Sequence, residues 1–425
     1  MNNKLDRIFE IVSFYDTCRW SSEREVRMKN EESLINFYDK TLNDDTKLLT
    51  HWLGYITNRQ MGFERIFKEG GFVFSELADE YKKDEKDFWA LLNPNSNSDS
   101  SFIQEDKETK VQKDGKEIKR YSFIGHTEPN KLINEKDIEN NRVIFKSRFL
   151  PIDYFSILYT LDMLTSYQRS LSYFIAQIYK TYKVKKENLI QKILFSLYLL
   201  SYHDIKQKNY TDMNNFEEIK KDVENRTKEI KQILDNPKKF EKEFEKFQKE
   251  EIYRQKRAWC CLRDFLKSPE FNSYFEKAML ANTDLNKEEL KGLSDIEMLR
   301  QLELPGDVWN NRPNFQKCIR NDEKFDNSKS NRYLREYYKG NENLKTGNSY
   351  PEQFDITFDF VPKMCDKNNC DICPIGIISN KAKKEEGFEK ICLGNTSKYC
   401  TVALVGCGYK MMCKGEEECE LLKLL

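Results

Sequence analysis

The residues with the clearest metal-binding potential lie near the C-terminus. Residues 364–376 read MCDKNNCDICPIG, with three cysteines within nine residues and a proline directly after the last one. Eight of the twelve cysteines lie between residues 365 and 419: Cys365, Cys370, Cys373, Cys392, Cys400, Cys407, Cys413 and Cys419. A CxxC pair presents two thiolates on one tight turn, where both can bind the same metal. The clustering predicts a thiolate-ligated metal module in this tail.

Two metal chemistries fit the spacing. Four thiolates bind Zn2+ tetrahedrally, and eight cysteines suffice for two such sites. Three closely spaced cysteines with a more distant fourth also suit an iron-sulfur cluster of the 4Fe-4S type. Buried free thiols are the alternative without a metal, and a core position is expected for the isolated Cys18, Cys260, Cys261 and Cys318. The spacing leaves zinc and iron-sulfur both open.

A second stretch that could carry chemistry lies upstream of the tail. Residues 304–312 read LPGDVWNNR, which places Asp307 after a Pro-Gly turn and Arg312 nearby as a cation. A carboxylate held beside a reacting centre stabilises positive charge that develops there. Pro-Gly-Asp is also ordinary N-cap chemistry, so Asp307 either serves a site or begins a helix.

Together these stretches resemble the helix-hairpin-helix (HhH-GPD) DNA glycosylase superfamily. In that family a hairpin and a helix precede an Asp in a Gly/Pro-rich segment, and in many members four C-terminal cysteines hold an iron-sulfur cluster. In this chain KGLSDIEMLRQLEL, residues 291–304, corresponds to the hairpin and second helix, with Lys291 and Gly292 at the turn. Asp307 corresponds to the family Asp. The resemblance implies a DNA partner and excision of a damaged or modified base. Because this chain would carry large insertions relative to that family, unusual or modified bases, including those of phage DNA, are the expected targets.

Base excision would require further contacts to DNA. An enzyme that acts on a base must draw it out of the stack, so it needs a wedge and contacts to the flanking phosphates. Gln60, in ITNRQ, corresponds to the wedge of some family members or is an ordinary exposed helix residue. NNRVIFKSRF places Arg142, Lys146 and Arg148 among aromatic residues on a short segment, which suits either contact with a nucleic-acid strand or an ordinary β-strand with one polar face.

The elements that must position these residues are predicted to be mainly helical. Apolar residues recur at spacings of three and four over residues 47–67, and again in a long stripe that follows Pro151. A buried helix is expected from about 187 to 202. Residues 214–257 predict a charged amphipathic helix pair, broken near Pro237, which is either a solvated arm with one apolar stripe or a dedicated binding element.

The region between residues 93 and 144 is polar and rich in turn residues. NPNSNSDSS, residues 93–101, indicates a solvated loop or insertion, with a short hairpin expected around YSFIGH. Composition and the resemblance together divide the chain into a helical part (1–92), a charged loop or insertion (93–144), long helices with a charged arm (145–257), a part that resembles the helix-hairpin-helix region (258–350) and a cysteine-rich tail (351–425).

Composition narrows the class of protein further. The 71 lysines and arginines balance the 71 aspartates and glutamates, so any charged binding face must come from local patterning. The first residues lack the features of a secretory signal, and ILFSLYLLSY, residues 193–202, is too short to span a bilayer. We therefore expect a cytoplasmic protein with no membrane partner, in which cysteines bind metal rather than form disulfides.

Two functions follow from the sequence. The first is a DNA glycosylase-like enzyme in which Asp307 stabilises the developing sugar cation. The second is a non-enzymatic, α-helical nucleic-acid-binding or scaffold protein with a zinc or iron-sulfur structural module. The absence of GxxxxGK[ST] and GxGxxG patterns argues against nucleotide hydrolysis and dinucleotide chemistry.

Overall fold

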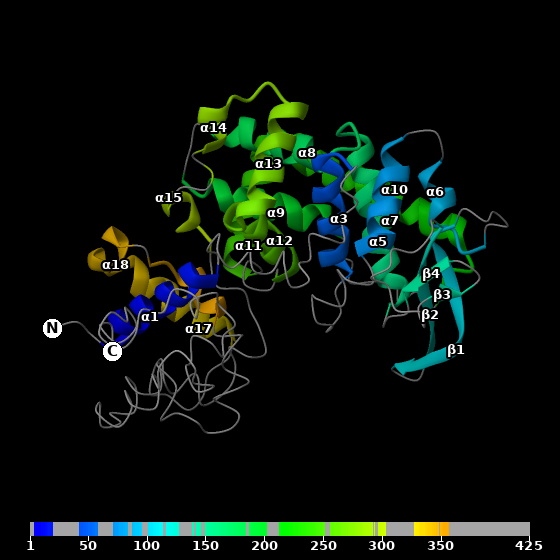
Figure 1. Cartoon of the computed structure of the whole chain (residues 1–425), viewed down its shortest axis with the longest axis horizontal. Helices are drawn as coiled ribbons and strands as arrows, with labels where there is room; N and C mark the ends of the chain where they lie inside the picture. Colours follow the sequence, from blue (N-terminus) through cyan, green and yellow to red (C-terminus); the bar gives the residue numbers. More distant parts are fainter. Residues whose placement is uncertain are drawn as a thin grey trace. The chain divides into compact units, whose positions relative to one another are not determined.

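The computed structural model of the chain describes its helical and sheet-forming parts. The described residues are 4–19, 42–57, 71–83, 87–95, 101–113, 116–126, 138–139, 142–145, 149–183, 187–201, 212–250, 256–291, 293, 296–302, 327–347 and 349–356. Within these ranges the chain is mainly helical, as predicted, with a four-stranded antiparallel sheet (Figure 1).

The chain divides into two compact units. The larger unit comprises Glu32–Lys249 and Arg257–Lys291, and the smaller unit comprises Met1–Glu31, Glu250–Lys256 and Gly292–Leu425. The five-part division expected from composition stays a prediction.

Helices form most of the larger unit. They are α3 (Asp44–Ile56), α5 (Gly71–Lys82), α6 (Phe88–Leu91), α7 (Pro151–Thr165), α8 (Leu171–Tyr182), α9 (Leu189–Leu200), α10 (Phe216–Leu234), α11 (Pro237–Glu250), α12 (Lys256–Lys267), α13 (Pro269–Asn282) and α14 (Lys287–Lys291). α3 contacts α5, α7, α8 and α13, and it is buried from Asp45 to Ile56. It is therefore a central helix of this unit.

Local capping sets both ends of α3. The Asn43 side chain accepts a 2.8 Å hydrogen bond from the backbone N–H of Thr46, and two aspartates occupy the first turn. At the other end the Thr57 hydroxyl donates to the Leu53 carbonyl at 2.8 Å. The helix expected over 47–67 thus begins earlier and ends at Ile56.

The long helical stripe predicted after Pro151 is two helices, α7 and α8. Between them Gln168 and Arg169 both adopt left-handed backbone, with φ near 55°. The Arg169 guanidinium donates to the Tyr81 carbonyl at 2.7 Å and lies over the Tyr81 ring, so a contact with α5 holds the turn. Ser170 then caps α8 by accepting from the backbone N–H of Tyr173. Tertiary contacts replace the glycine that such a turn would usually require.

The sheet arises from the region expected to be a loop or insertion. Its strands are β1 (Ile103–Lys113), β2 (Lys116–Gly125), β3 (Ile138–Glu139) and β4 (Arg142–Phe145), in the spatial order β1-β2-β4-β3. The short hairpin expected around YSFIGH is part of a much longer β1–β2 hairpin, in which Tyr121, Ser122 and Phe123 lie in β2 and pair with Glu105, Gln104 and Ile103 of β1. In β4, Phe145 pairs with Phe123 of β2.

An aromatic cluster joins the sheet to the helices. The Phe123 ring lies 4.9 Å from Phe74 of α5, 4.8 Å from Phe149 and 4.7 Å from Tyr154 of α7, measured between centroids. All four rings are buried. Burial of one such aromatic side chain stabilises the fold by about 1.5–3 kcal/mol, so this cluster anchors the sheet.

The charged helix pair predicted around Pro237 is confirmed as α10 and α11. α11 buries Phe240, Phe244 and Phe247, whose rings lie 5.0 to 5.8 Å from the ring of Phe195 on α9. α9 is buried along its whole length, as predicted. α10 packs on α7.

The smaller unit contains α1 (Lys4–Arg19), α15 (Ile296–Leu299), α17 (Asn327–Lys339), α18 (Glu342–Thr346) and a 3-10 helix, η7 (Pro351–Ile356). Phe9 of α1 is fully buried and lies 4.7 Å from the ring of Phe354 on η7. The Asp6 carboxylate accepts hydrogen bonds from Tyr337 and Asn341 at 2.8 and 2.6 Å. These contacts connect the two ends of the described sequence.

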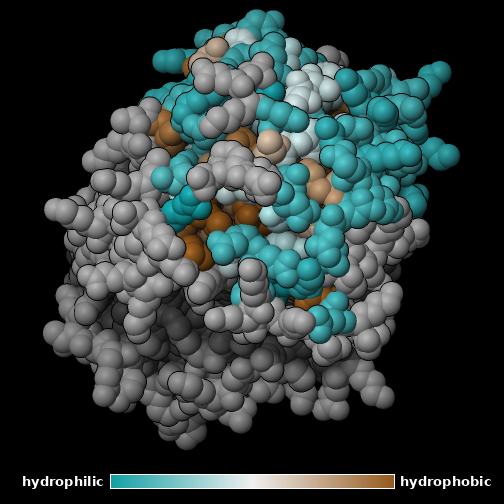
Figure 2. Space-filling view, turned by 90° about the vertical axis from the view of Figure 1, so that its right-hand side faces the viewer, coloured by the Kyte–Doolittle hydropathy of each residue, from teal (hydrophilic) through white to brown (hydrophobic). Residues whose placement is uncertain are grey.

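The described surface is largely hydrophilic on the side shown in Figure 2, where apolar residues gather mainly in a hollow. None of the described helices is both long enough and apolar enough to cross a lipid bilayer.

Candidate functional site

Most residues predicted to carry chemistry lie outside the described ranges. These are Gln60, Lys146, Arg148, Gly292, Asp307, Arg312 and the eight tail cysteines Cys365, Cys370, Cys373, Cys392, Cys400, Cys407, Cys413 and Cys419. Lys291 is the last residue of α14, and only its backbone is described. Among the described residues, no group of three or more His, Cys, Asp or Glu side chains is arranged to hold a metal ion. The metal site in the tail stays a prediction.

The helix that ends at Lys291 is firmly anchored in the larger unit. Asn286 and Glu289 form a reciprocal capping pair at the start of α14, with bonds of 2.9 and 3.0 Å between each side chain and the other's backbone N–H. Lys183 forms an ion pair with Glu289, and the Tyr179 hydroxyl donates to the Glu289 carbonyl at 2.7 Å. α14 is therefore fixed to α8. Along the chain, α15 begins four residues after Gly292.

A buried charged cluster links α3 to α12. The Asp264 carboxylate accepts hydrogen bonds from Nε2 of His51, at 3.1 Å, and from the Tyr55 hydroxyl. Nε of Arg263 donates to the other carboxylate oxygen at 3.3 Å. His51, Tyr55 and Arg263 are at most 4% exposed, and Asp264 is 8% exposed. We name this set the His51–Asp264 cluster.

The electrostatics of the cluster keep Asp264 ionised and His51 neutral. Burial opposes ionisation of Asp264, but the Arg263 guanidinium and the hydrogen bonds from His51 and Tyr55 outweigh it and lower the pKa to about 2. Burial lowers the pKa of His51, and Asp264 only partly opposes that shift. Burial and the neighbouring carboxylate raise the pKa of Tyr55 well above its usual value. Near neutral pH the ionised Asp264 carboxylate thus accepts hydrogen bonds from two neutral groups, His51 and Tyr55, and from the cationic Arg263.

Two cysteines adjoin the cluster. Cys260 and Cys261 are both buried, in agreement with the core position predicted for them. Burial raises the pKa of Cys261 well above its usual value, and the nearby Asp264 charge raises it further. Because the thiolate is the reactive form, Cys261 is not an activated nucleophile. Enclosure on all sides makes the cluster a structural connection between helices rather than a substrate site.

One local signal for this cluster is present in the sequence, although no motif marks it. Asp264 lies in AWCCLRDFL, an otherwise mostly apolar helical stretch in α12. A carboxylate on the buried side of a helix requires a partner, and Arg263 next to it supplies only one. The contribution of His51 comes from more than two hundred residues away in the sequence, so no local pattern could identify it.

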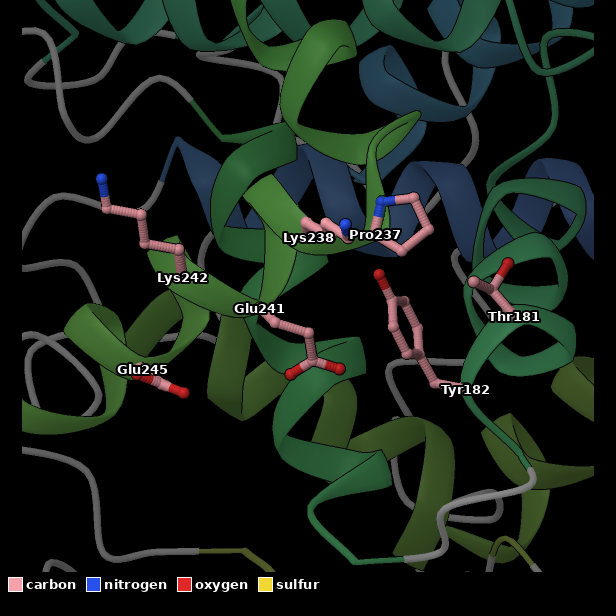
Figure 3. Close-up of a pocket in the computed structure, with 7 residues that line it drawn as sticks. All are labelled: Thr181, Tyr182, Pro237, Lys238, Glu241, Lys242 and Glu245. Carbon is pink, nitrogen blue, oxygen red and sulfur yellow. The ribbon is translucent and has the colours of Figure 1, made fainter.

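A surface hollow lies between the end of α8 and the start of α11, with a volume of about 580 Å³ (Figure 3). It is lined by Thr181, Tyr182, Pro237, Lys238, Glu241, Lys242 and Glu245. The Tyr182 hydroxyl points toward the start of α11 and has no hydrogen-bond partner among the described residues. The Tyr182 ring stacks on Phe240 at 4.7 Å and lies 4.6 Å from the Lys192 ammonium.

The hollow offers charges of both signs but no catalytic pair of nucleophile and base. Lys192 is 4% exposed and forms a 2.6 Å ion pair with Glu241, so this carboxylate is already engaged. Lys238, Lys242 and Glu245 are exposed. The hollow can therefore contact a charged ligand, but its described side chains cannot activate a nucleophile.

Comparison with known proteins gives no relative from which a function can be transferred, because no family model, no curated protein and no solved structure matches the chain.

Proposed function

We propose that the chain is a DNA-processing enzyme that excises a damaged or modified base, as helix-hairpin-helix glycosylases do. One observation carries the proposal: the sequence places Lys291 and Gly292, then Asp307, then Cys365, Cys370 and Cys373 in the order that this superfamily uses. The mainly helical fold of the described residues is compatible with it. The short helices α14 and α15 precede and follow Gly292 in the sequence.

The proposed reaction breaks the bond between a base and its deoxyribose. As the base departs, positive charge develops on the sugar, and the Asp307 carboxylate stabilises that charge and positions a water molecule for attack. The base is first drawn out of the helix, with Gln60 as the proposed wedge in the gap. Lys291, Gly292 and Arg312, together with Lys146 and Arg148, are proposed to contact DNA.

The cysteine tail is proposed to bind an iron-sulfur cluster or Zn2+ through thiolates. Sites with only sulfur ligands are usually structural or redox sites, so the metal would support the fold or the DNA-binding surface rather than hydrolyse the bond. A cysteine-rich metal module fits a reducing compartment, and we therefore propose a cytoplasmic location. Absorbance of the purified protein separates the metals, because iron-sulfur clusters are coloured and zinc thiolates are not.

The decisive test is release of abasic sites from DNA. Wild type is incubated with duplexes that contain a panel of damaged and modified bases, and abasic sites are cleaved with alkali and counted. We expect Asp307→Asn to lower the rate by about 100-fold or more, the usual effect of removing one charge-stabilising group. The matched control is Asp235→Asn, the same chemical change at an exposed C-cap of α10.

The outcomes distinguish the candidate functions. Equal rates in wild type and Asp307→Asn would show that Asp307 has been assigned wrongly. If no base in the panel is released by wild type, base excision is rejected, and the non-enzymatic nucleic-acid-binding or scaffold function takes its place.

A further inference from the structure

α11 has an apolar side that is completely occupied by the protein itself. Phe240, Phe244 and Phe247 are 0 to 2% exposed and pack on Phe195 and Tyr198 of α9. The helix is therefore fixed in its rotation about its own axis. Residues on the opposite side must face solvent.

The side opposite the phenylalanines carries every lysine of the helix. At about 100° per residue, Lys238, Lys239, Lys242, Lys246 and Lys249 lie within an arc of about 100°, and no glutamate falls inside that arc. The glutamates of α11 lie on the two flanks, between the lysines and the buried side. All five lysines are exposed, and none of their ammonium groups has a partner among the described residues. We name these five residues the lysine ridge.

In the preceding helix, α10, lysines and glutamates are not separated onto different sides as they are in α11. Its outward side mixes Lys221 and Lys228 with Asn225, Gln232 and Glu218. Arg226 on α10 is paired with Glu229 at 3.1 Å. A helix whose only requirement is solubility has such mixed charges, whereas the ridge presents one sign of charge over several turns.

The ridge has dimensions that fit a phosphate backbone. At about 1.5 Å of rise per residue, Lys238 and Lys249 are separated by about 16 Å along the helix axis. Duplex DNA carries one phosphate per about 1.7 Å of its axis, so about ten phosphates lie within that length. Lysine ammonium groups on flexible stems contact phosphates without reading base sequence.

The surroundings of the ridge favour duplex DNA over two other polyanionic surfaces. The described ridge has no exposed aromatic side chain on which unpaired bases could stack, as single-strand binders require. An amphipathic helix that binds a membrane inserts its apolar side, but here that side is buried against α9. In the hollow of Figure 3, Glu241 and Glu245 border Lys238 and Lys242, so carboxylates limit the phosphate track on that flank.

We propose that the lysine ridge of α11 is a sequence-independent contact surface for the phosphate backbone of duplex DNA. The choice of DNA rests on the proposed function, but the ridge does not depend on Asp307 or on the metal. It would hold the duplex by charge while other residues select the base.

The test is fluorescence anisotropy of the full-length chain with a labelled duplex of about 20 base pairs, titrated from about 50 to about 200 mM salt. The ridge variant combines Lys239→Gln, Lys242→Gln and Lys246→Gln. The control variant combines Lys221→Gln, Lys228→Gln and Lys277→Gln, which removes the same charge from exposed lysines of α10 and α13. Circular dichroism melting verifies that both variants fold like wild type.

We expect the ridge variant to bind at least tenfold more weakly at low salt and the control to bind within about twofold of wild type. Loss of three phosphate contacts would also reduce the slope of log K against log salt by about 2.7. Equal weakening by both variants would overturn the proposal, as would wild type that does not bind the duplex. Ridge-dependent binding to vesicles of phosphatidylserine and phosphatidylcholine, with DNA binding unchanged, would also overturn it.

The ridge and the proposed enzyme activity can fail separately. Asp307→Asn should bind the duplex like wild type, because a cationic surface and not this carboxylate supplies the affinity. A ridge variant with normal duplex affinity rejects the ridge even if abasic sites are released. Ridge-dependent affinity without any base release supports the ridge and rejects base excision.

Discussion

Replacing Asp264 by asparagine should destabilise the larger unit, because this carboxylate is the shared acceptor of the His51–Asp264 cluster. The substitution keeps the size of the side chain and removes its charge. Asparagine retains one carbonyl oxygen, so it cannot accept from His51, Tyr55 and Arg263 as the carboxylate does. The asparagine amide would also place its own N–H donors against the donor groups of His51, Tyr55 or Arg263.

The magnitude follows from the pKa and the burial of Asp264. Its pKa falls from 3.8 to about 2, which at about 1.36 kcal/mol per pKa unit corresponds to roughly 2 kcal/mol of stabilisation at neutral pH. Removing one partner of a buried ion pair costs about 3–5 kcal/mol in other proteins. We therefore expect the free energy of unfolding to fall by about 2–4 kcal/mol.

Urea unfolding followed by tryptophan fluorescence measures this loss. Trp52 on α3 and Trp259 on α12 are buried and lie on the two helices that the cluster joins. With an m value of about 3 kcal/mol/M, the unfolding midpoint should fall by about 1 M. Hydrogen exchange of peptides from α3 and α12 should show the same loss locally.

Asp79→Asn is the matched control for this substitution. It makes the same chemical change in a surface ion pair with Lys83, in which both side chains are more than a third exposed. Such pairs contribute about 0–1 kcal/mol. If Asp264→Asn unfolds at the same urea concentration as Asp79→Asn, the cluster does not stabilise the unit and the reasoning is wrong. The pH dependence gives a second check, because the difference from wild type should shrink as pH falls through 3.8 toward 2.

Two further substitutions test the same unit. The pKa of His51 is lowered in the folded chain, so the unfolded chain takes up a proton at a higher pH than the folded chain does. The free energy of unfolding should therefore fall from pH 7 to pH 5, and it should fall less in His51→Gln than in wild type. Identical pH profiles of the two proteins would contradict this. Phe195→Ala removes the ring on which three phenylalanines of α11 pack. The free energy of unfolding should fall by about 3–5 kcal/mol, and hydrogen exchange in α11 should become faster. Unchanged hydrogen exchange in α11 would contradict the packing.

The sequence predicts the parts of the fold whose cause is local. Phe240, Phe244 and Phe247 repeat at helical spacing and Pro237 begins a new helix, so the charged pair α10 and α11 could be placed correctly. α9 was also predicted, because its apolar run is too long for a strand and too short for a membrane span. Hydrophobic periodicity is a property of residues that are close in the sequence, so it predicts these helices without information about distant parts of the chain.

The breaks in the helices are less predictable because distant residues cause them. No glycine or proline marks the turn between α7 and α8, where Gln168 and Arg169 are left-handed and Tyr81 accepts from the arginine. The sheet, too, depends on contacts between residues that are distant in the sequence. Its β1–β2 hairpin is highly charged, which favours a loop in a prediction from sequence. In the fold, Phe123 of β2 and Phe145 of β4 both contact Phe74 of α5, and Phe123 also contacts Tyr154 of α7.

The candidate functional residues show the same difference between local and distant signals. Local motifs in the sequence indicated Asp307 and the tail cysteines, all of which lie outside the described residues, so these predictions remain untested by the structure. The His51–Asp264 cluster could not be found from motifs, because its two halves are more than two hundred residues apart. Motif reading finds residues that act next to each other in the sequence, and it misses charges that meet only in the fold.

The lysine ridge shows why charge counts are a poor guide to binding surfaces. The whole chain has no net charge, and α11 itself has five lysines and four glutamates, so composition favours a solvated arm as much as a binding element. A bound polyanion, however, responds to charges within a Debye length of about 10 Å, and not to the sum over the chain. Once Phe195 and Tyr198 fix the rotation of α11, the glutamates lie on the two flanks and the lysines occupy the side that points away from α9. The buried phenylalanines thus decide which sign of charge α11 presents, and a substitution that lets the helix rotate should weaken duplex binding without removing any lysine.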